Sequence, residues 1–412
     1  MNRAIPVHGL HGATRFGAKC VGACLALALV VALCLPATAF AQARDQAKRI
    51  HDRLTGTPPT AEMLTAMTSL VSQGNAVGAG LLAIDGNAQV RANGNFYSVV
   101  LKNFAMPWTN RDQTVFAPLN DYVATVIGMV RDDVPFNQLL SADIVYVGNA
   151  SGLPAYSVSS NAHYEEMESR ALNLREVLQR RTQSEVTGLP SSATAGVLTT
   201  RAAARAFFVA GTNRAMFRFT LMAHLCRDLE QTMDTTLPTD RIRQDVSRSP
   251  GGDSRLFLGN CAGCHTGMDP MTQAFAYYDY EFTDDEANGR IVYTQGQVRP
   301  KYFNNEDTFP QGFRTPDDRW ENRWRRGVNQ LLGWDPSRPG SGAGAKSLGE
   351  ELANSDAFAQ CQVEKVFQSV CLRAPSDVED RAEVSRIVGV FRNNGHSLKR
   401  VFAETAAYCR GG

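Results

Sequence analysis

The chain has 412 residues, of which 43% are hydrophobic and 20% are charged. This length and apolar content suffice for two or three domains with packed cores. The formal net charge is only +1 at pH 7, and no basic stripe or interleaved basic and aromatic motif occurs. The composition therefore excludes an ordinary nucleic-acid-binding protein.

Residues 1–41 have the features of a secretory signal peptide. Three basic residues precede the almost wholly apolar run Val21–Leu35, and Pro36 breaks that run before the small residues Ala39 and Ala41. This order is typical of a signal peptide cleaved after Ala41. The alternative is an uncleaved membrane anchor, because the apolar run approaches the length that spans a bilayer. We expect cleavage and export to the bacterial periplasm.

A multi-helical domain is expected over residues 42–246. Apolar residues recur at helical spacing in five segments, which are Ala43–Leu54, Thr60–Gln73, Phe116–Arg131, Glu165–Arg181 and Thr200–Met233. Thr60 is the expected cap of its helix, since it follows two prolines. The run Ala142–Val147 indicates either a strand or an extended connection, and its length does not decide between them.

A second unit, residues 247–345, is expected to begin at the hinge-like segment Ser247–Ser254, which contains the sequence Pro-Gly-Gly. It carries Cys261-Ala262-Gly263-Cys264-His265, the C-x-x-C-H attachment sequence of covalent c-type haem. Two thiols at this spacing reach the two vinyl groups of one porphyrin, and the adjacent imidazole binds the iron. We expect one covalent haem c, with Cys261 and Cys264 as thioether anchors and His265 as proximal iron ligand.

Other interpretations of this motif need a context that the sequence does not supply. A zinc knuckle requires a second pair of ligands, and a thioredoxin-like dithiol requires a surrounding βαβ pattern. A disulfide beside an incidental histidine is a further alternative. Haem c is attached outside the bacterial cytoplasm, which agrees with the predicted export.

The sixth iron ligand is left open by the sequence. No methionine follows Met271, and Met268 and Met271 are too close to His265 to reach the other face of the ring. A five-coordinate iron that binds peroxide or another small ligand is therefore an alternative. Arg255 and Arg299 could pair with haem propionates or lie on a solvated surface. The distal candidates elsewhere in the chain are His224, Met222, Met216 and His396.

Two local structures are expected after the haem motif. The aromatic run from Phe275 to Phe282, an acidic turn and Ile291-Val292-Tyr293 predict a β-hairpin. Thr315-Pro316-Asp317-Asp318 predicts the start of an amphipathic helix. Its expected apolar face, which either walls the haem pocket or packs in the ordinary way, comprises Trp320, Trp324, Val328, Leu331 and Leu332.

The C-terminal unit, residues 346–412, is expected to be helical. Ser355–Leu372 reads as one helix, and Ser397 is expected to cap another. After cleavage and haem attachment four cysteines remain, an even number that predicts two disulfides. Two of them, ten residues apart on one helix, would be separated by about 15 Å and cannot pair. The pairing we favour is Cys371 with Cys409 and Cys226 with Cys361.

The order of these segments resembles the planctomycete-type cytochrome c proteins, a largely uncharacterised bacterial family. The similarity covers residues 115–410. It rests on Val130–Asp143, on Gly196–Thr200 with the following segment to Cys226, and above all on Cys261–Pro270, which matches the family's C-x-x-C-H-x-x-M-D-P signature. The tail from Ser355 to Leu398 is similar to its C-terminal helical domain. An additional amino-terminal cytochrome and a proline-rich stretch, found in many relatives, are missing.

The resemblance implies an exported haem c protein but no substrate. We therefore expect a mainly α-helical, periplasmic, mono-haem cytochrome that passes electrons to another periplasmic redox protein. The membrane would be contacted only through an uncleaved signal peptide. One alternative is a haem enzyme, such as a peroxidase or an oxygenase, with an open distal face. Another is a binding or scaffold protein that haem stabilises.

Overall fold

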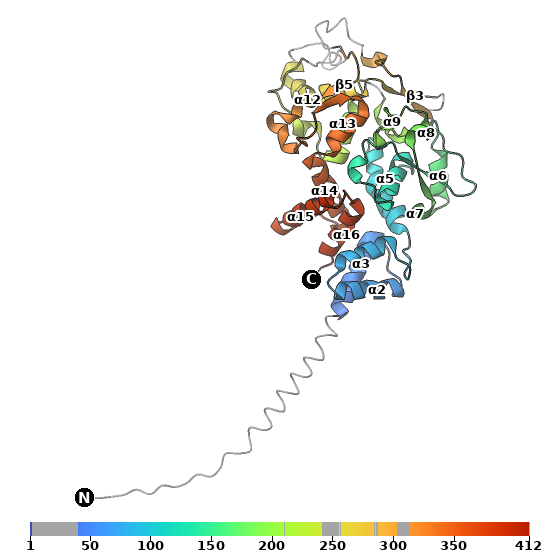
Figure 1. Cartoon of the computed structure of the whole chain (residues 1–412), viewed down its shortest axis with the longest axis vertical. Helices are drawn as coiled ribbons and strands as arrows, with labels where there is room; N and C mark the ends of the chain where they lie inside the picture. Colours follow the sequence, from blue (N-terminus) through green and yellow to red (C-terminus); the bar gives the residue numbers. More distant parts are fainter. Residues whose placement is uncertain are drawn as a thin grey trace.

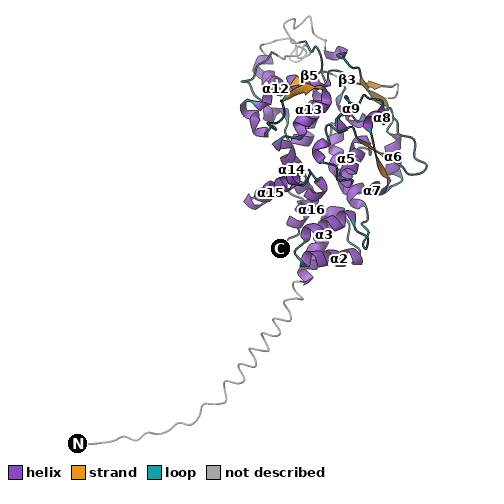
Figure 2. Ribbon diagram, in the orientation of Figure 1, coloured by secondary structure: helices purple, strands orange, loops and turns teal. Residues whose placement is uncertain are grey.

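A computed structural model describes residues 1, 40–209, 211–240, 255, 257–283, 285, 287–302 and 314–411 (Figure 1). Most of the predicted signal peptide and the whole predicted hinge Ser247–Ser254 lie outside these residues. Within them the fold is mainly α-helical, as expected, with three small two-stranded antiparallel sheets (Figure 2). No helix in the described ranges is both long enough and apolar enough to cross a membrane.

The front domain begins with helices that pack on one another, and the one cap predicted here, Thr60, is confirmed. Thr60 accepts a hydrogen bond from the backbone N–H of Met63 at 3.2 Å, and Asn120 caps the next long helix in the same way. The helical elements in this part are residues 40–55, α2 (Ala61–Ser72), α3 (Ala76–Asp85), the π-helical turn η1 (Phe96–Leu101), α4 (Lys102–Ala105), η2 (Met106–Thr109), α5 (Asp121–Arg131) and η3 (Phe136–Gln138).

Two long helices predicted in the front domain are interrupted. Leu178–Arg181 forms strand β2, so the helix predicted over Glu165–Arg181 ends before it. Strand β2 pairs with β1 (Val145–Gly148), which shows that the run Ala142–Val147 contributes to a strand. Further on, the predicted helix is divided, because α9 ends at Phe207 and Asn213, in the left-handed conformation with φ of 59°, precedes the first residue of α10. The elements are α6 (Ala162–Ser169), α7 (Leu174–Val177), α8 (Gln183–Thr187), η4 (Gly196–Thr199), α9 (Arg201–Phe207), α10 (Arg214–Thr220), η5 (Leu221–Leu225) and η6 (Leu229–Thr232).

The central unit contains the haem motif and the predicted β-hairpin. Strands β3 (Tyr278–Phe282) and β4 (Gly289–Tyr293) pair in an antiparallel register that sets Tyr278 opposite Tyr293, which confirms the hairpin. Before it come η8 (Phe257–Cys261), α12 (Ala262–Thr272) and η9 (Gln273–Phe275), and after it η10 (Pro300–Tyr302).

The prediction of an amphipathic helix that starts at Thr315 is wrong. Arg319–Glu321 forms strand β5, paired with β6 (Ser341–Ala343), and only the short 3-10 turns η11 (Arg323–Arg325) and η12 (Gly327–Leu332) follow. The side chain of Asn322 accepts a hydrogen bond from the N–H of Trp324 at 3.0 Å, and Gly327 takes a φ of 68°, which no continuous helix allows.

The C-terminal unit is helical, as predicted, and comprises α13 (Gly344–Ala353), α14 (Asp356–Cys371), α15 (Val378–Asn393) and α16 (Leu398–Tyr408). The side chain of Ser397 accepts a hydrogen bond from the N–H of Arg400 at 3.1 Å, which confirms the predicted cap. The favoured disulfides are both present: Cys226–Cys361 and Cys371–Cys409, with Cα–Cα distances of 5.3 and 5.5 Å. Two disulfides are typical of a protein of an oxidising compartment.

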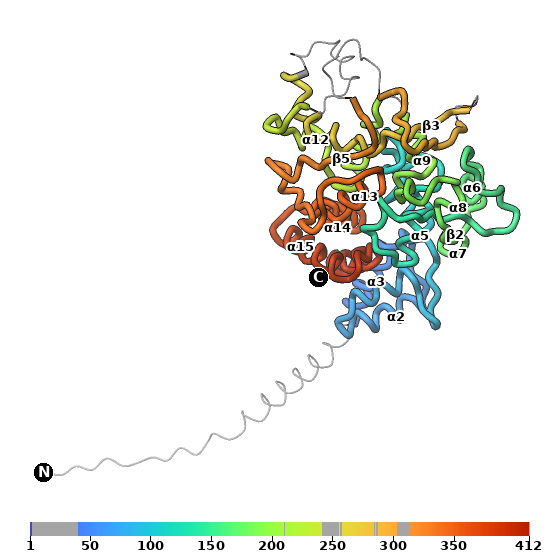
Figure 3. The backbone as a smooth tube through the Cα atoms, turned by 45° about the horizontal axis from the view of Figure 1, so that its top comes forward, coloured from blue at the N-terminus to red at the C-terminus, as the bar shows by residue number. Residues whose placement is uncertain are grey.

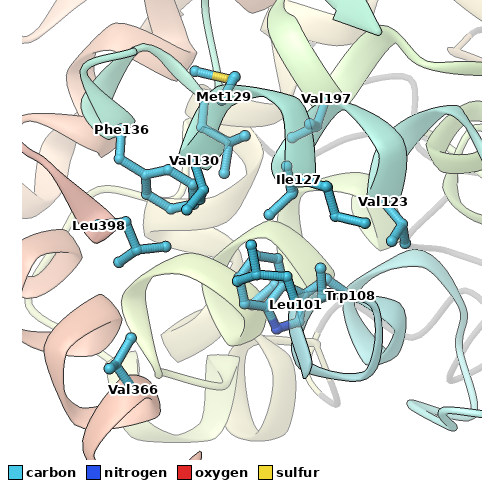
Figure 4. Packing of buried hydrophobic residues seen from close by; sticks show 14 of the residues in the cluster. Leu101, Trp108, Val123, Ile127, Met129, Val130, Phe136, Val197, Val366 and Leu398 are labelled. Atoms are coloured by element: carbon cyan, nitrogen blue, oxygen red, sulfur yellow. The ribbon is translucent and has the colours of Figure 1, made fainter. Parts of the chain in front are cut away.

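Helix α3, near the start of the described chain, packs against α16, its last helix (Figure 3). Helix α5 lies behind them as the centre of the main core. Figure 4 shows its residues Val123, Ile127 and Val130 facing side chains of η1, α14 and α16, such as Leu101, Val366 and Leu398. The core therefore joins the front domain and the C-terminal unit into one packed body.

Candidate functional site

The motif residues lie at the start of α12, where the π-helical turn η8 passes into the α-helix. Cys261 is the last residue of η8 and the cap of α12, and Cys264 and His265 occupy the first turn. Both cysteines are unpaired and half-buried, whereas the other four described cysteines form disulfides. Two free thiols thus lie beside one imidazole, which is the donor set that covalent haem attachment requires.

His265 is held from behind by a buried carboxylate. Its Nδ1 lies 3.0 Å from Oδ2 of Asp269, one helical turn further on, and the Asp269 side chain is only 1% exposed. Arg214 of α10 donates from Nε to the other carboxylate oxygen at 3.2 Å. A carboxylate accepts from an N–H, so this pair places the proton of the neutral imidazole on Nδ1 and the lone pair on Nε2. Such a partner orients an iron-binding imidazole and raises its basicity.

Helix α12 makes an unusually close contact with Trp324. A Cβ atom at Gly267 would lie 1.8 Å from the indole Nε1, so only glycine fits at this position. Trp324 is fully buried and also contacts the ring of Phe217 at 5.8 Å between centroids. The indole N–H finds no hydrogen-bond partner among the described residues. This contact fixes the helix that carries His265 against η11 and α10.

The thiol of Cys264 does not resemble that of a redox dithiol. Burial raises its pKa, and the nearby acids Glu230 and Asp228 add to the effect. Reactive dithiols instead have a lowered thiol pKa. In the described ranges no group of three histidine, cysteine or acidic side chains is arranged to hold a bare metal ion. Neither a thioredoxin-like centre nor a zinc knuckle, which needs four ligands, is therefore supported by this geometry.

Exposed apolar side chains, which we call the apolar shell, lie on the segment before the motif, beside Thr232 and on η12. Met233 contacts α12, since its Cε would lie 3.1 Å from a Cβ at Gly263, and Asn329 of η12 donates to the carbonyl of Thr232 at 2.8 Å. These contacts bring η12 beside the residues that precede Asp234. The exposed apolar residues of this shell, with their exposed fractions, are Met233 (46%), Leu258 (56%), Val328 (61%) and Leu331 (88%).

A cluster of large, solvent-exposed apolar side chains is typical of a surface that binds a ligand or another protein. The macrocycle of haem is a large apolar plate, and Cys261, Cys264 and His265 would hold it, with these apolar side chains available nearby to shield it from water. The donor set, the oriented imidazole and the apolar shell together fit the predicted haem c.

The distal candidate His224 is enclosed by protein. It is fully buried on η5, its Nε2 lies 2.6 Å from the hydroxyl of Tyr122, and rings of Trp108 and Phe358 lie at 5.3 and 6.3 Å. Burial lowers its pKa well below the usual value. Its surroundings are those of a core histidine, with no space for a porphyrin against its ring.

The other distal candidates are also far from forming one site. Met216 is buried on α10, the helix that packs against α12, whereas Met222 is half-buried on η5. His396 lies in the turn between α15 and α16, where its ring contacts Phe391 at 5.1 Å. In Figure 1, α13 and α14 separate these C-terminal helices from α12. The described structure brings none of these residues together with His265.

Met268 and Met271 are buried in α12, in agreement with the local packing role expected for them. Arg299 pairs with Asp279 at 3.2 Å and with Glu281 at 3.5 Å, so it already has acidic partners. Arg255 is exposed. Neither arginine is placed by these observations at a propionate.

Two features of the site were missed by the sequence analysis. The partnership of His265 and Asp269 could have been expected, because residues four apart share one face of a helix. The apolar shell could not, because Val328 and Leu331 were assigned to a buried helical face that does not form. Comparison with protein-family models, with curated proteins and with solved structures finds no match to this chain.

Proposed function

We propose that the protein is an exported mono-haem c-type cytochrome that transfers electrons in the periplasm. The observation that carries the proposal is the arrangement at α12: two unpaired thiols and an imidazole oriented by a buried carboxylate, next to exposed apolar side chains. Cys261 and Cys264 would form the thioether bonds, and Nε2 of His265 would bind the iron. Haem supplies a one-electron iron couple when bound.

Each supporting residue has a defined part in this proposal. Asp269 holds the imidazole in one orientation and keeps its proton on Nδ1, while Arg214 donates a hydrogen bond to the Asp269 carboxylate and holds it in place. Trp324 excludes water from the inner side of α12 by filling the space above Gly267. The two disulfides support an oxidising compartment. On the sequence motif, we also propose membership of the planctomycete-type cytochrome c proteins.

A haem enzyme is the second candidate, and one observation favours it. A carboxylate on Nδ1 makes the imidazole a stronger electron donor, which stabilises the more oxidised states of an iron that it binds. None of the distal candidates in the described ranges lies with His265, so an open sixth position is compatible with the structure. Peroxide turnover would then be expected.

Absorption spectra of the periplasmically matured protein separate the two candidates. We expect spectra of the oxidised and reduced protein to be low-spin and unchanged by carbon monoxide if the protein is an electron carrier with six-coordinate iron. A high-spin spectrum that shifts with carbon monoxide would contradict the electron-carrier proposal and favour the haem enzyme. Absence of any haem absorption would refute both.

A further inference from the structure

A second candidate binding site lies away from the haem motif. A cavity of about 860 Å³ opens between the helix of residues 40–55, the segment η1–α4–η2 and α14, and it includes Lys365 in its wall. We refer to it as the Lys365 cavity. Its volume falls in the range of small-molecule sites, and it shares no lining residue with the site at α12.

One wall of the Lys365 cavity is aromatic and rigid. The rings of Phe104 and Trp108 meet edge to face at 5.0 Å between centroids, and Phe104 is held from the other side by Phe402 at 5.3 Å. At the mouth, Val99 is 46% exposed and Leu372 is 78% exposed. Leu372 adopts the left-handed conformation with φ of 58°, which is unfavourable for leucine. The cavity therefore presents apolar surface that water now covers.

The charges in this cavity are mainly positive and have no acidic partners. Arg49 and Arg53 donate to the backbone carbonyls of Arg410 and Val370, at 2.9 and 2.7 Å. No ion pair involving either arginine is found among the described residues. The one acidic lining residue, Asp52, already pairs with Lys48 outside the cavity.

Lys365 is the deepest of these cations. Its Nζ lies 4.8 Å from the centroid of Trp108 and donates one hydrogen bond, to the carbonyl of Ala223 at 2.7 Å. An ammonium has three N–H groups, so two remain for another acceptor. Burial lowers the pKa of Lys365 to about 7, as expected for an amine held out of water without a counter-ion.

We propose that the Lys365 cavity binds a small organic anion, namely a carboxylate on an aromatic or otherwise bulky apolar body. The carboxylate accepts hydrogen bonds from Lys365, with Arg49 and Arg53 adding positive potential at the rim. The apolar body lies against Phe104 and Trp108 and covers Val99 and Leu372. This site does not depend on the haem proposal, because none of its groups touches the motif.

Calorimetric titration of the exported, folded protein, as purified and whatever its haem content, with 2-naphthoate tests the proposal. Naphthalene-2-methanol is the neutral probe of matched shape. We expect naphthoate to bind more tightly than the alcohol. Lys365→Met should weaken naphthoate binding by on the order of tenfold or more, as expected for the loss of a charged hydrogen bond, and leave the alcohol unaffected. Lys346→Met, at a half-buried lysine on α13 that is no part of the cavity wall, is the control and should bind both probes normally.

A second variant protects the test against a folding defect. Val99→Glu places a negative charge at the exposed mouth and should weaken naphthoate more than the alcohol without disturbing the core. The proposal is overturned if naphthoate fails to bind at millimolar concentration, or if both variants bind it as well as the unmodified protein does. Haem content, measured on the same samples, tests the haem proposal independently of naphthoate binding.

Discussion

Replacing Lys365 by methionine should stabilise the protein near neutral pH. Burial lowers the pKa of Lys365 from 10.5 to about 7, which corresponds to a cost on the order of 5 kcal/mol for keeping the amine protonated in the folded state. The contact with Trp108 offsets this cost by roughly 1–2 kcal/mol. Methionine has a similar length and no charge, so we expect the variant to gain roughly 2–4 kcal/mol at pH 6.

The sign of the pH dependence follows from where the amine loses its proton. Below about pH 7 the amine is charged in both the folded and unfolded chain, and the whole cost is present. Between about pH 7 and 10.5 only the unfolded chain binds this proton, so the stability of the unmodified protein rises with pH. The advantage of Lys365→Met should therefore shrink as the pH increases.

Urea unfolding of both proteins at pH 6.0 and pH 9.5, followed by circular dichroism, measures this difference. Lys346→Met, at a half-buried lysine with one hydrogen bond to Ser191, serves as the control and should change the free energy of unfolding by about the same small amount, no more than about 1 kcal/mol, at both pH values. A Lys365→Met protein that is no more stable at pH 6.0, or whose advantage is the same at both values, would refute the burial argument.

Two further predictions concern α12. Asp269→Asn should weaken the electron donation of His265 and raise the reduction potential by about 60 mV, which is a tenfold change in the relative stability of the two iron states; an unchanged potential in a redox titration would contradict the role of Asp269. Gly267→Ala should clash with Trp324 and lower the free energy of unfolding by roughly 1–3 kcal/mol. Gly389→Ala in α15, where nothing lies within 4 Å of the added Cβ, is its control and should stabilise by about 0.5–1 kcal/mol. Equal effects of the two alanines in thermal unfolding would show that the close contact is not real.

Elements whose ends are set by neighbouring residues could be predicted from the sequence. Ser397 and Thr60 cap their helices through bonds to residues three positions on, and the apolar spacing of α14 lies within one segment. That same helix excluded one disulfide pairing, since its two cysteines lie too far apart to pair with each other, and of the two pairings left the favoured one is present. In these cases the contacts that fix the element lie within a few residues in the chain, or the geometry of one helix reduces the number of possible disulfide pairings.

Elements that depend on distant partners could not be predicted. The strand Arg319–Glu321 forms because it pairs with Ser341–Ala343, and β2 forms because it pairs with β1. For the candidate site, the motif alone predicts the two thiols and the imidazole. The apolar shell near it depends on how η12 packs onto the residues near Thr232, which the sequence does not show. The Lys365 cavity likewise combines segments from three distant parts of the chain.

The most direct test of the central proposal is whether haem is covalently bound at Cys261 and Cys264. The mature protein, produced in a host with an active cytochrome c maturation system, would be extracted with acidified acetone and analysed by intact mass spectrometry and pyridine haemochrome absorption. We predict that one haem per chain stays with the polypeptide, and that it is lost when both cysteines are replaced by alanine. A polypeptide of unmodified mass, with no haem left after extraction, would contradict the account.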